Sequence, residues 1–354
     1  MHRKLLAAAV ASAFAMPALA QVPPELQIYG RVNVTMERIE TDNSNNPAVP
    51  NQSNYEFVDN SSRIGFRYNK GLTPGLKAIF QIESRVNLTD GGGTFTSRDS
   101  FAGLEGGFGT IRLGRTIGPV YYATYDYISM HNHDTGTSSD ALLNGTIFGN
   151  QGFMNNTLWY TSPKIGNFTI DAAFSLLGEA RVNQSMDQPR YIGLVGAYDT
   201  GPLHLAISYA NTENDADLDP GAGSTPSSAT AYTIGGAYDF KFMVLGALYE
   251  KAKRDILGGD VSSDYFRFAA MFPVGQHEFH LNYGWVDADG STGAKQYTLG
   301  YNYNITKATK VYAFYTAVDN DNNGNFVIGG STTTIGAATG AQYTSIAVGL
   351  RHNF

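Results

Sequence analysis

Residues 345–354 read SIAVGLRHNF, so the chain ends on a phenylalanine. Ile346, Val348, Leu350 and Phe354 fall on one parity of this stretch, and small or polar residues dominate the other. Most chains instead end in a few polar residues that nothing holds in place. A period of two with one apolar side is typical of a half-buried β-strand. The alternation therefore predicts that the last residues form a strand, which must pair with another strand.

The same alternation recurs along the chain. Residues 27–38, QIYGRVNVTMER, set Ile28 and Met36 on one side against Asn33 and Thr35 on the other. Short turns and long polar loops alternate between such segments, and together they separate sixteen predicted strands. The first two strands are expected at 27–40 and 61–70, with the polar stretch 41–57 between them as a loop.

Alternation alone also fits a soluble β-sandwich, but three further features favour a membrane barrel. The predicted strands reach the 9–11 residues that a tilted strand needs to cross a bilayer. Aromatic residues gather near the strand ends, as in an interfacial girdle, and short turns alternate with long loops. Every backbone polar group in lipid must be paired within the protein, so the sheet has to close. The prediction is an all-β fold, a 16-stranded antiparallel transmembrane β-barrel with its apolar parity toward lipid and its last strand paired with its first.

The N-terminus reads as a secretory signal. A basic start at residues 2–4 precedes an apolar stretch from Leu5, and small residues stand at Ala18 and Ala20. An uncleaved anchor is the alternative, but the apolar run is shorter than the ~20 residues that span a bilayer. We therefore predict a signal peptide at 1–20 and a single barrel domain at 21–354.

Composition limits the function classes. Cysteine is absent, which excludes disulfides and thiol chemistry. The net charge of −7 disfavours a nucleic-acid partner, which would select a basic surface. An outer-membrane enzyme would need a nucleophile with its base or paired carboxylates, and the few histidines lie in no catalytic motif. A plugged barrel is disfavoured because no plug-sized N-terminal domain is present.

Three stretches carry a family resemblance: residues 62–84 (SRIGFRYNKGLTPGLKAIFQIES), 97–115 (SRDSFAGLEGGFGTIRLGR) and 348–354 (VGLRHNF). They resemble the general-diffusion porins of Gram-negative bacteria. The resemblance implies short periplasmic turns, long extracellular loops and a third long loop folded into the lumen of a multi-pass outer-membrane barrel. It also implies a homotrimer, contact with outer-membrane lipid and lipopolysaccharide, and passive diffusion of ions and small hydrophilic solutes. Phe354 resembles the assembly signal that the barrel insertion machinery reads.

A pore of this kind needs no cofactor, but it does need a charged constriction. The lumen parity of the first strands carries five arginines: Arg31, Arg63, Arg67, Arg85 and Arg98. The resemblance implies that Arg31, Arg63 and Arg98 match the family's basic wall. Glu83 shares their face and is expected to pair with one of them. The alternative is that some of these arginines only cap strand ends or hold loops.

The facing acid is expected in the third long loop, residues 119–154, at Asp126, with Asp134 and Asp140 as further candidates. The family's usual Pro-Glu loop motif is missing, so the resemblance does not settle which acid is used. Trp159 stands on the lumen parity where the family usually has arginine, which predicts a weaker anion preference. The alternative is that Trp159 only packs under the loop.

Metal sites are disfavoured. Residues 319–325 (DNDNNGN) begin like a calcium loop but lack the acidic residue at the twelfth position. Residues 131–134 (HNHD) offer two histidines that are more often simply polar loop residues.

Overall fold

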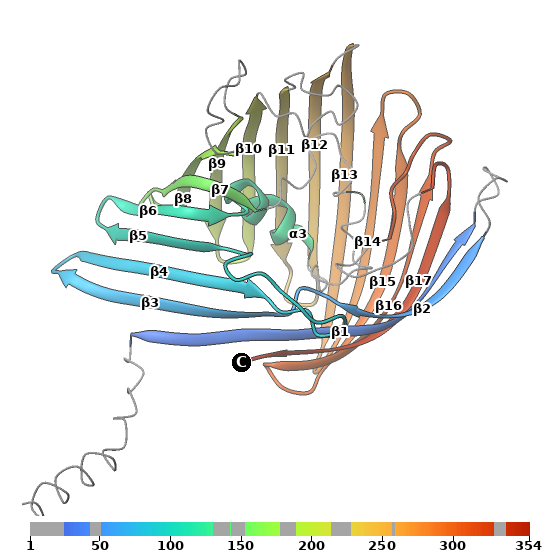
Figure 1. The fold of residues 1–354 in the computed structure, drawn as a ribbon, viewed down its shortest axis with the longest axis horizontal. Coiled ribbons are helices and arrows are strands. Elements are labelled where there is room, and N and C mark those ends of the chain that lie inside the picture. Colours follow the sequence, from blue (N-terminus) through green and yellow to red (C-terminus); the bar gives the residue numbers. More distant parts are fainter. Residues whose placement is uncertain are drawn as a thin grey trace, which may run out of the picture.

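The computed structural model describes residues 25–42, 51–129, 142, 153–177, 189–213, 228–256, 259–328 and 338–354. The predicted signal peptide at 1–20 lies outside these residues. Within them the chain forms one antiparallel sheet that closes on itself into a barrel (Figure 1). Its strands are β1 (Leu26–Asp42), β2 (Gln52–Asp59), β3 (Arg63–Thr73), β4 (Leu76–Arg85), β5 (Ser100–Gly106), β6 (Gly109–Thr116), β7 (Met154–Thr161), β8 (Phe168–Leu176), β9 (Arg190–Thr200), β10 (Leu203–Glu213), β11 (Ser228–Asp239), β12 (Val244–Ile256), β13 (Gly259–Val274), β14 (His277–Ala288), β15 (Ala294–Asn304), β16 (Thr309–Asn320) and β17 (Gln342–Asn353).

The barrel has sixteen strand positions because β2 and β3 share one of them. β2 pairs with the second half of β1, and β3 pairs with its first half. Between them the chain breaks at Ser61, which has a positive φ of 61°, and Asp59 accepts a 2.9 Å hydrogen bond from the Ser62 amide. The prediction of a loop over 41–57 is therefore wrong in its second half, where β2 begins at Gln52. The polar stretch 256–262 also predicts a loop, but β12 runs to Ile256 and β13 begins at Gly259.

The last strand closes the barrel against the first, as predicted. β17 pairs with β1 from Arg31 opposite Asn353 to Asp42 opposite Gln342. Past the end of β17, Phe354 and Gly30 exchange two backbone hydrogen bonds of 2.9 and 3.1 Å. No backbone edge is left open at this seam, which is what a hydrocarbon environment requires.

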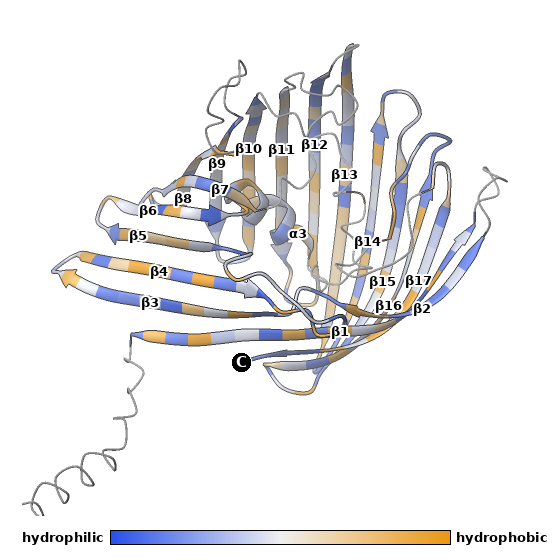
Figure 2. Cartoon of the chain, viewed as in Figure 1, coloured by the Kyte–Doolittle hydropathy of each residue, from blue (hydrophilic) through white to orange (hydrophobic). Residues whose placement is uncertain are grey.

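The two faces of the strands separate by parity, also as predicted. Ile28 and Met36 of β1 are about half exposed on the outside, whereas Asn33 and Glu37 on the other parity are buried. Figure 2 shows the resulting alternation of apolar and polar bands along β3 and β4. Exposed aromatics such as Tyr238 and Phe242 gather where β11 turns into β12. Within the described ranges, no helix is long and apolar enough to cross a membrane.

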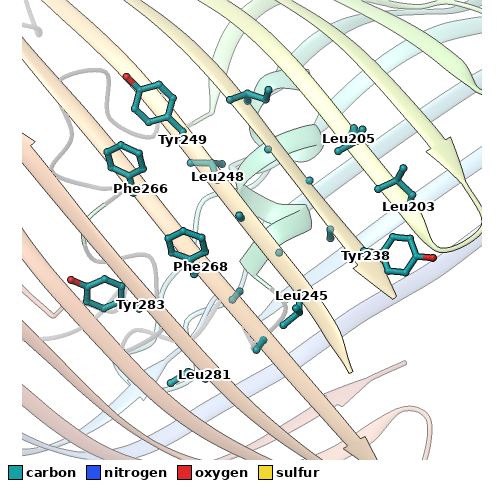
Figure 3. A pocket seen from close by; sticks show the side chains of 18 residues that line it. Leu203, Leu205, Tyr238, Leu245, Leu248, Tyr249, Phe266, Phe268, Leu281 and Tyr283 are labelled. Atoms are coloured by element: carbon teal, nitrogen blue, oxygen red, sulfur yellow. The ribbon is translucent and has the colours of Figure 1, made fainter. Parts of the chain in front are cut away.

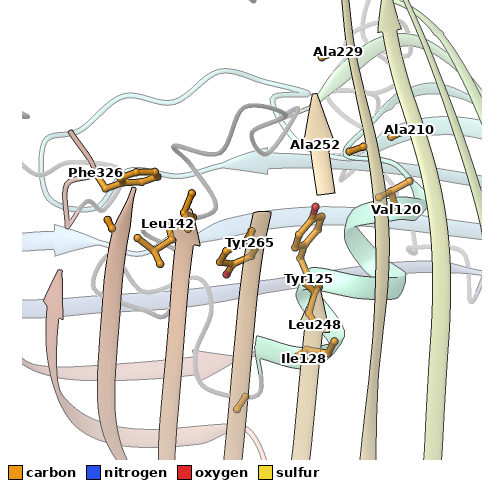
Figure 4. Close-up of a cluster of buried hydrophobic side chains, with 14 of the residues drawn as sticks. Val120, Tyr125, Ile128, Leu142, Ala210, Ala229, Leu248, Ala252, Tyr265 and Phe326 are labelled. Carbon is orange, nitrogen blue, oxygen red and sulfur yellow. The ribbon is translucent and has the colours of Figure 1, made fainter. Parts of the chain in front are cut away.

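A short helical segment lies inside the barrel (Figure 1). It comprises α2 (Pro119–Tyr121), a π-helical turn η1 (Tyr122–Asp126) and α3 (Tyr127–Ser129). Figure 4 shows its Tyr125 and Ile128 near Leu248 and Tyr265 of the barrel wall, and its Val120 beside Ala210. The described part of the third loop therefore folds inward and docks on the inner face of β8–β13.

Candidate functional site: the charged lumen wall and the inward loop

A row of arginines crosses adjacent strands on the inner face of the barrel. In the register, Arg31 of β1 lies opposite Arg63 of β3, which lies opposite Arg85 of β4. Arg98 precedes β5 and continues the row, because its amide donates to the carbonyl of Glu83 at 3.1 Å. Strand pairing thus brings together four arginines that are spread over 68 residues of sequence, from 31 to 98.

Glu83 binds two of these arginines. Its Oε1 accepts a hydrogen bond from Nε of Arg98 and lies 3.9 Å from Nη1 of Arg63, while its Oε2 accepts from the Tyr29 hydroxyl at 2.9 Å. The Glu83 side chain is only 8% exposed. A buried carboxylate with two hydrogen-bond donors and a further cation 3.9 Å away restricts the orientation of the guanidinium groups.

Arg67 is held differently from the rest of the predicted row. Its Nε donates to Oε1 of Gln81 at 2.8 Å, and its guanidinium lies 4.1 Å from the centre of the Tyr29 ring. Tyr29 itself packs over Gly65, where a Cβ would come within 2.3 Å of the ring. Arg67 is therefore held against the wall by stacking. It pairs with Gln81 and so lies nearer the β3–β4 turn than Glu83 does.

Two further cations extend the row, and our sequence reasoning did not select them. Arg351 of β17 points inward and lies opposite Asn33 of β1. Lys310 of β16 pairs in register with Arg351 and places its Nζ 3.4 Å from Oε2 of Glu278. The parity of the final strand marks Arg351 as inward, so the sequence did contain the signal for it.

Trp159 joins the wall to the inward loop. Its indole Nε1–H donates to Oδ1 of Asp171 at 2.8 Å, and the guanidinium of Arg112 lies 4.6 Å above the ring. The ring of Tyr122 stacks on it at a centroid distance of 6.1 Å and an interplanar angle of 13°. The structure therefore places Trp159 inward, in contact with both an arginine and the loop.

The loop is tethered to the arginine side through Tyr122, whose hydroxyl donates to Oδ2 of Asp99. Desolvation, followed by the negative Asp99 carboxylate, raises the pKa of Tyr122, so the phenol stays protonated and remains a donor. Asp99, like Arg351 and Lys310, was not selected from the sequence. Asp126 lies in η1 and interacts electrostatically with Arg351. Asp134 and Asp140 lie outside the described residues.

The weaker metal candidates gain no support. In the part of the chain that the structure describes, no three His, Cys, Asp or Glu side chains gather as a metal site would require. The stretch 131–134 lies outside that part.

Comparisons with known proteins agree with this architecture. The family model for Gram-negative porins matches residues 7–323. Outer membrane porin protein 32 of Delftia acidovorans is 29% identical over 312 residues, covering 83% of this chain and 85% of its own. The solved anion-selective porin from Comamonas acidovorans is 26% identical, with a TM-score of 0.78 over 93% of this chain and 99% of that one. The trimer form of OmpT from Vibrio cholerae shares the fold at 15% identity, with a TM-score of 0.66 over 93% of this chain and 99% of that one. The chain belongs to the Gram-negative porin family and is an outer-membrane β-barrel channel protein.

Proposed function

We propose that this channel passes ions and small hydrophilic solutes passively between an arginine wall and the third loop. The arginine row on β1, β3 and β4, with Arg98 beside it, is the observation that carries the proposal. Acid on the facing loop, with Asp126 as the described candidate, would complete a transverse field across the lumen. A polar solute can align its dipole in such a field, whereas an apolar solute must displace ordered water.

We further propose a modest anion preference. Arginines outnumber the Glu83 carboxylate on the wall, and the similar Comamonas acidovorans porin is described as anion-selective. Trp159 reduces the preference, because a neutral ring stands where the family usually supplies another arginine. Its contact with Arg112 further confines that guanidinium to one plane.

We also propose that residues 1–20 direct export of the chain and that the folded barrel assembles as a homotrimer. The homotrimer is supported by the trimer form of the similarly folded OmpT and by the exposed apolar outer face of the barrel. One apolar hollow of that face spans β10–β14 and includes Leu205, Ile234 and Phe268 (Figure 3). Lipid and lipopolysaccharide would contact such a surface, and Phe354 would be read by the insertion machinery.

The test is electrical. Refolded protein in a planar bilayer should give conductance steps in groups of three, and its reversal potential across a salt gradient should show a modest anion preference. Absence of conductance from folded, heat-modifiable protein would contradict the open channel. A clear cation preference would contradict control by the arginine wall.

A further inference from the structure

Three of the short turns carry an exposed lysine. Lys164 lies between β7 and β8, Lys241 between β11 and β12, and Lys307 between β15 and β16. The Lys241 side chain is 86% exposed. The turns between them, at 201–202 and 275–276, hold no basic residue. The three lysines therefore recur at every second hairpin over this part of the short-turn end, and we call them the basic rim.

The charge of the basic rim contrasts with that of the chain, whose net charge is −7. The turns that hold Lys164 and Lys307 contain no acidic residue, and within the described part of the chain neither lysine forms an ion pair. Lys241 has one carboxylate near it, with its Nζ 3.9 Å from Oδ2 of Asp239. Such an exposed pair is weak, because water screens both charges. The three turns therefore present cations whose charge is largely uncancelled.

Exposed apolar side chains stand beside each of these lysines. Ile165 follows the first lysine and is 63% exposed, Phe240 and Phe242 flank the second, and Ile305 precedes the third by two residues. The Phe240 ring packs against that of Tyr238 on the outer face, at a centroid distance of 4.5 Å. Apolar and aromatic side chains at strand ends mark the edge of the hydrocarbon layer, and a long cationic side chain beside them extends toward the headgroups. The basic rim therefore lies at the level of lipid phosphates.

The backbone at Lys241 gives independent support. Its φ is +75°, in a region that a residue with a long side chain seldom adopts. The Asp239 side chain holds this conformation, since its Oδ1 accepts a hydrogen bond from the Lys241 amide at 2.7 Å. Glycine or asparagine would fit the position with less strain. A lysine here is therefore better explained by what its side chain meets than by the needs of the turn.

We propose that the basic rim binds the phosphate groups of anionic phospholipids in the periplasmic leaflet of the outer membrane. The short-turn end of an outer-membrane barrel faces the periplasm. Neighbouring rim lysines are four strand positions apart, which is at least about 19 Å across the sheet. This separation exceeds the Debye length of about 8 Å at physiological salt, so each lysine meets its own lipid. The inference rests on the proposed contact with outer-membrane lipid and deepens it, and it does not depend on the ion preference of the channel.

The experiment measures lipid binding by the refolded full-length channel in a zwitterionic detergent. Phosphatidylglycerol or phosphatidylcholine is titrated into the protein at low salt, and native mass spectrometry counts the bound lipids. The wild type should bind phosphatidylglycerol in preference, at one site for each rim lysine. Each substitution, Lys164→Gln, Lys241→Gln or Lys307→Gln, should weaken one of these sites by about fivefold, and the triple variant should show no preference.

The matched control removes two lysines at the long-loop end. Lys251→Gln with Lys253→Gln changes the charge as much as Lys164→Gln with Lys307→Gln does. Both control lysines already pair with carboxylates, since Nζ of Lys251 lies 3.0 Å from Asp264 and Nζ of Lys253 lies 2.6 Å from Asp260. The control should therefore keep the wild-type preference for phosphatidylglycerol.

Three results would overturn the inference. Equal binding of the two lipids by the wild type would leave the proposed lipid contact standing but remove the role of the basic rim. A loss of preference as large in the control as in the rim variant would show that position does not matter. A rim variant that keeps its phosphatidylglycerol but no longer binds isolated peptidoglycan would assign the rim to the cell wall instead. Heat modifiability of each variant confirms that the barrel has folded.

Discussion

Replacing Glu83 by glutamine tests whether the arginine wall controls ion selection. The carboxylate is the common partner of Arg63 and Arg98, and it also accepts from Tyr29. Glutamine keeps the size and one acceptor oxygen but removes the charge. The wall therefore gains one net positive charge without gaining a side chain, and its arginines lose the group that holds their orientation.

The magnitude follows from Coulomb's law. An ion that passes about 6 Å from the carboxylate interacts with it by about 0.7 kcal/mol at the dielectric constant of water. Loss of that charge favours an anion about threefold and disfavours a cation by a similar factor, so the permeability ratio rises by up to about tenfold. At 0.1 M salt the Debye length of about 10 Å roughly halves the energy, which leaves a rise of about threefold to fourfold. At 1 M salt most of the effect should vanish.

The assay is the reversal potential in gradients centred at about 0.1 M and at about 1 M salt. Glu105→Gln is the matched control, because Glu105 pairs with Lys77 in an exposed ion pair at the short-turn end. It should change the ratio far less than Glu83→Gln does. An unchanged ratio at low salt in folded Glu83→Gln protein, or a rise as large in the control, would refute the idea that this part of the wall selects ions.

Three other substitutions test separate features. Trp159→Arg should move the reversal potential toward anions, because it adds a cation to the lumen; an unchanged ion preference would count against a pore-facing role. Gly235→Val should push Ile128 away from the wall and alter single-channel conductance while heat modifiability is retained; unaltered conductance would show that the loop does not depend on this contact. Deleting Phe354 removes both backbone hydrogen bonds to Gly30 and should lower the yield of folded protein in the outer membrane. The yield is measured by the heat modifiability of membrane fractions, and a wild-type yield would exclude an assembly role for Phe354.

The sequence was informative wherever parity decides the structure. Strands of a membrane barrel are long and amphipathic, so a period of two gives the strand, its face and the inward position of residues such as Arg63 and Glu83. The miss at β2 has a local cause. Residues 52–59, QSNYEFVD, do alternate, with Tyr55 and Phe57 exposed on the outer face, but they follow a polar stretch rich in asparagine that dominates the composition of the whole segment.

The partners of the loop could not be predicted in the same way. Parity shows that His204 and Arg351 point inward, but it does not give their height in the barrel or what they meet there. Asp99 belongs to no strand, and its part in tethering the loop depends on Tyr122, which reaches it across the fold. Such contacts depend on where a short helical segment docks, and that position is set by tertiary packing.

The inner wall itself explains why the loop docks on one side. In a water-filled lumen an inward apolar side chain is costly unless something covers it. Inward positions of β10–β12 nevertheless hold buried apolar residues, among them Ala206, Ala231, Leu248 and Ala252, and Figure 4 shows Leu248 and Ala252 on the side that receives the loop. Covering a side chain such as Ile128 there contributes about 1.5–3 kcal/mol. The strands that carry the arginine row are β1, β3 and β4, which lie outside this docking face. The loop is therefore drawn to β8–β13 by burial, and the backbone carbonyl of Ala123 contacts His204 there.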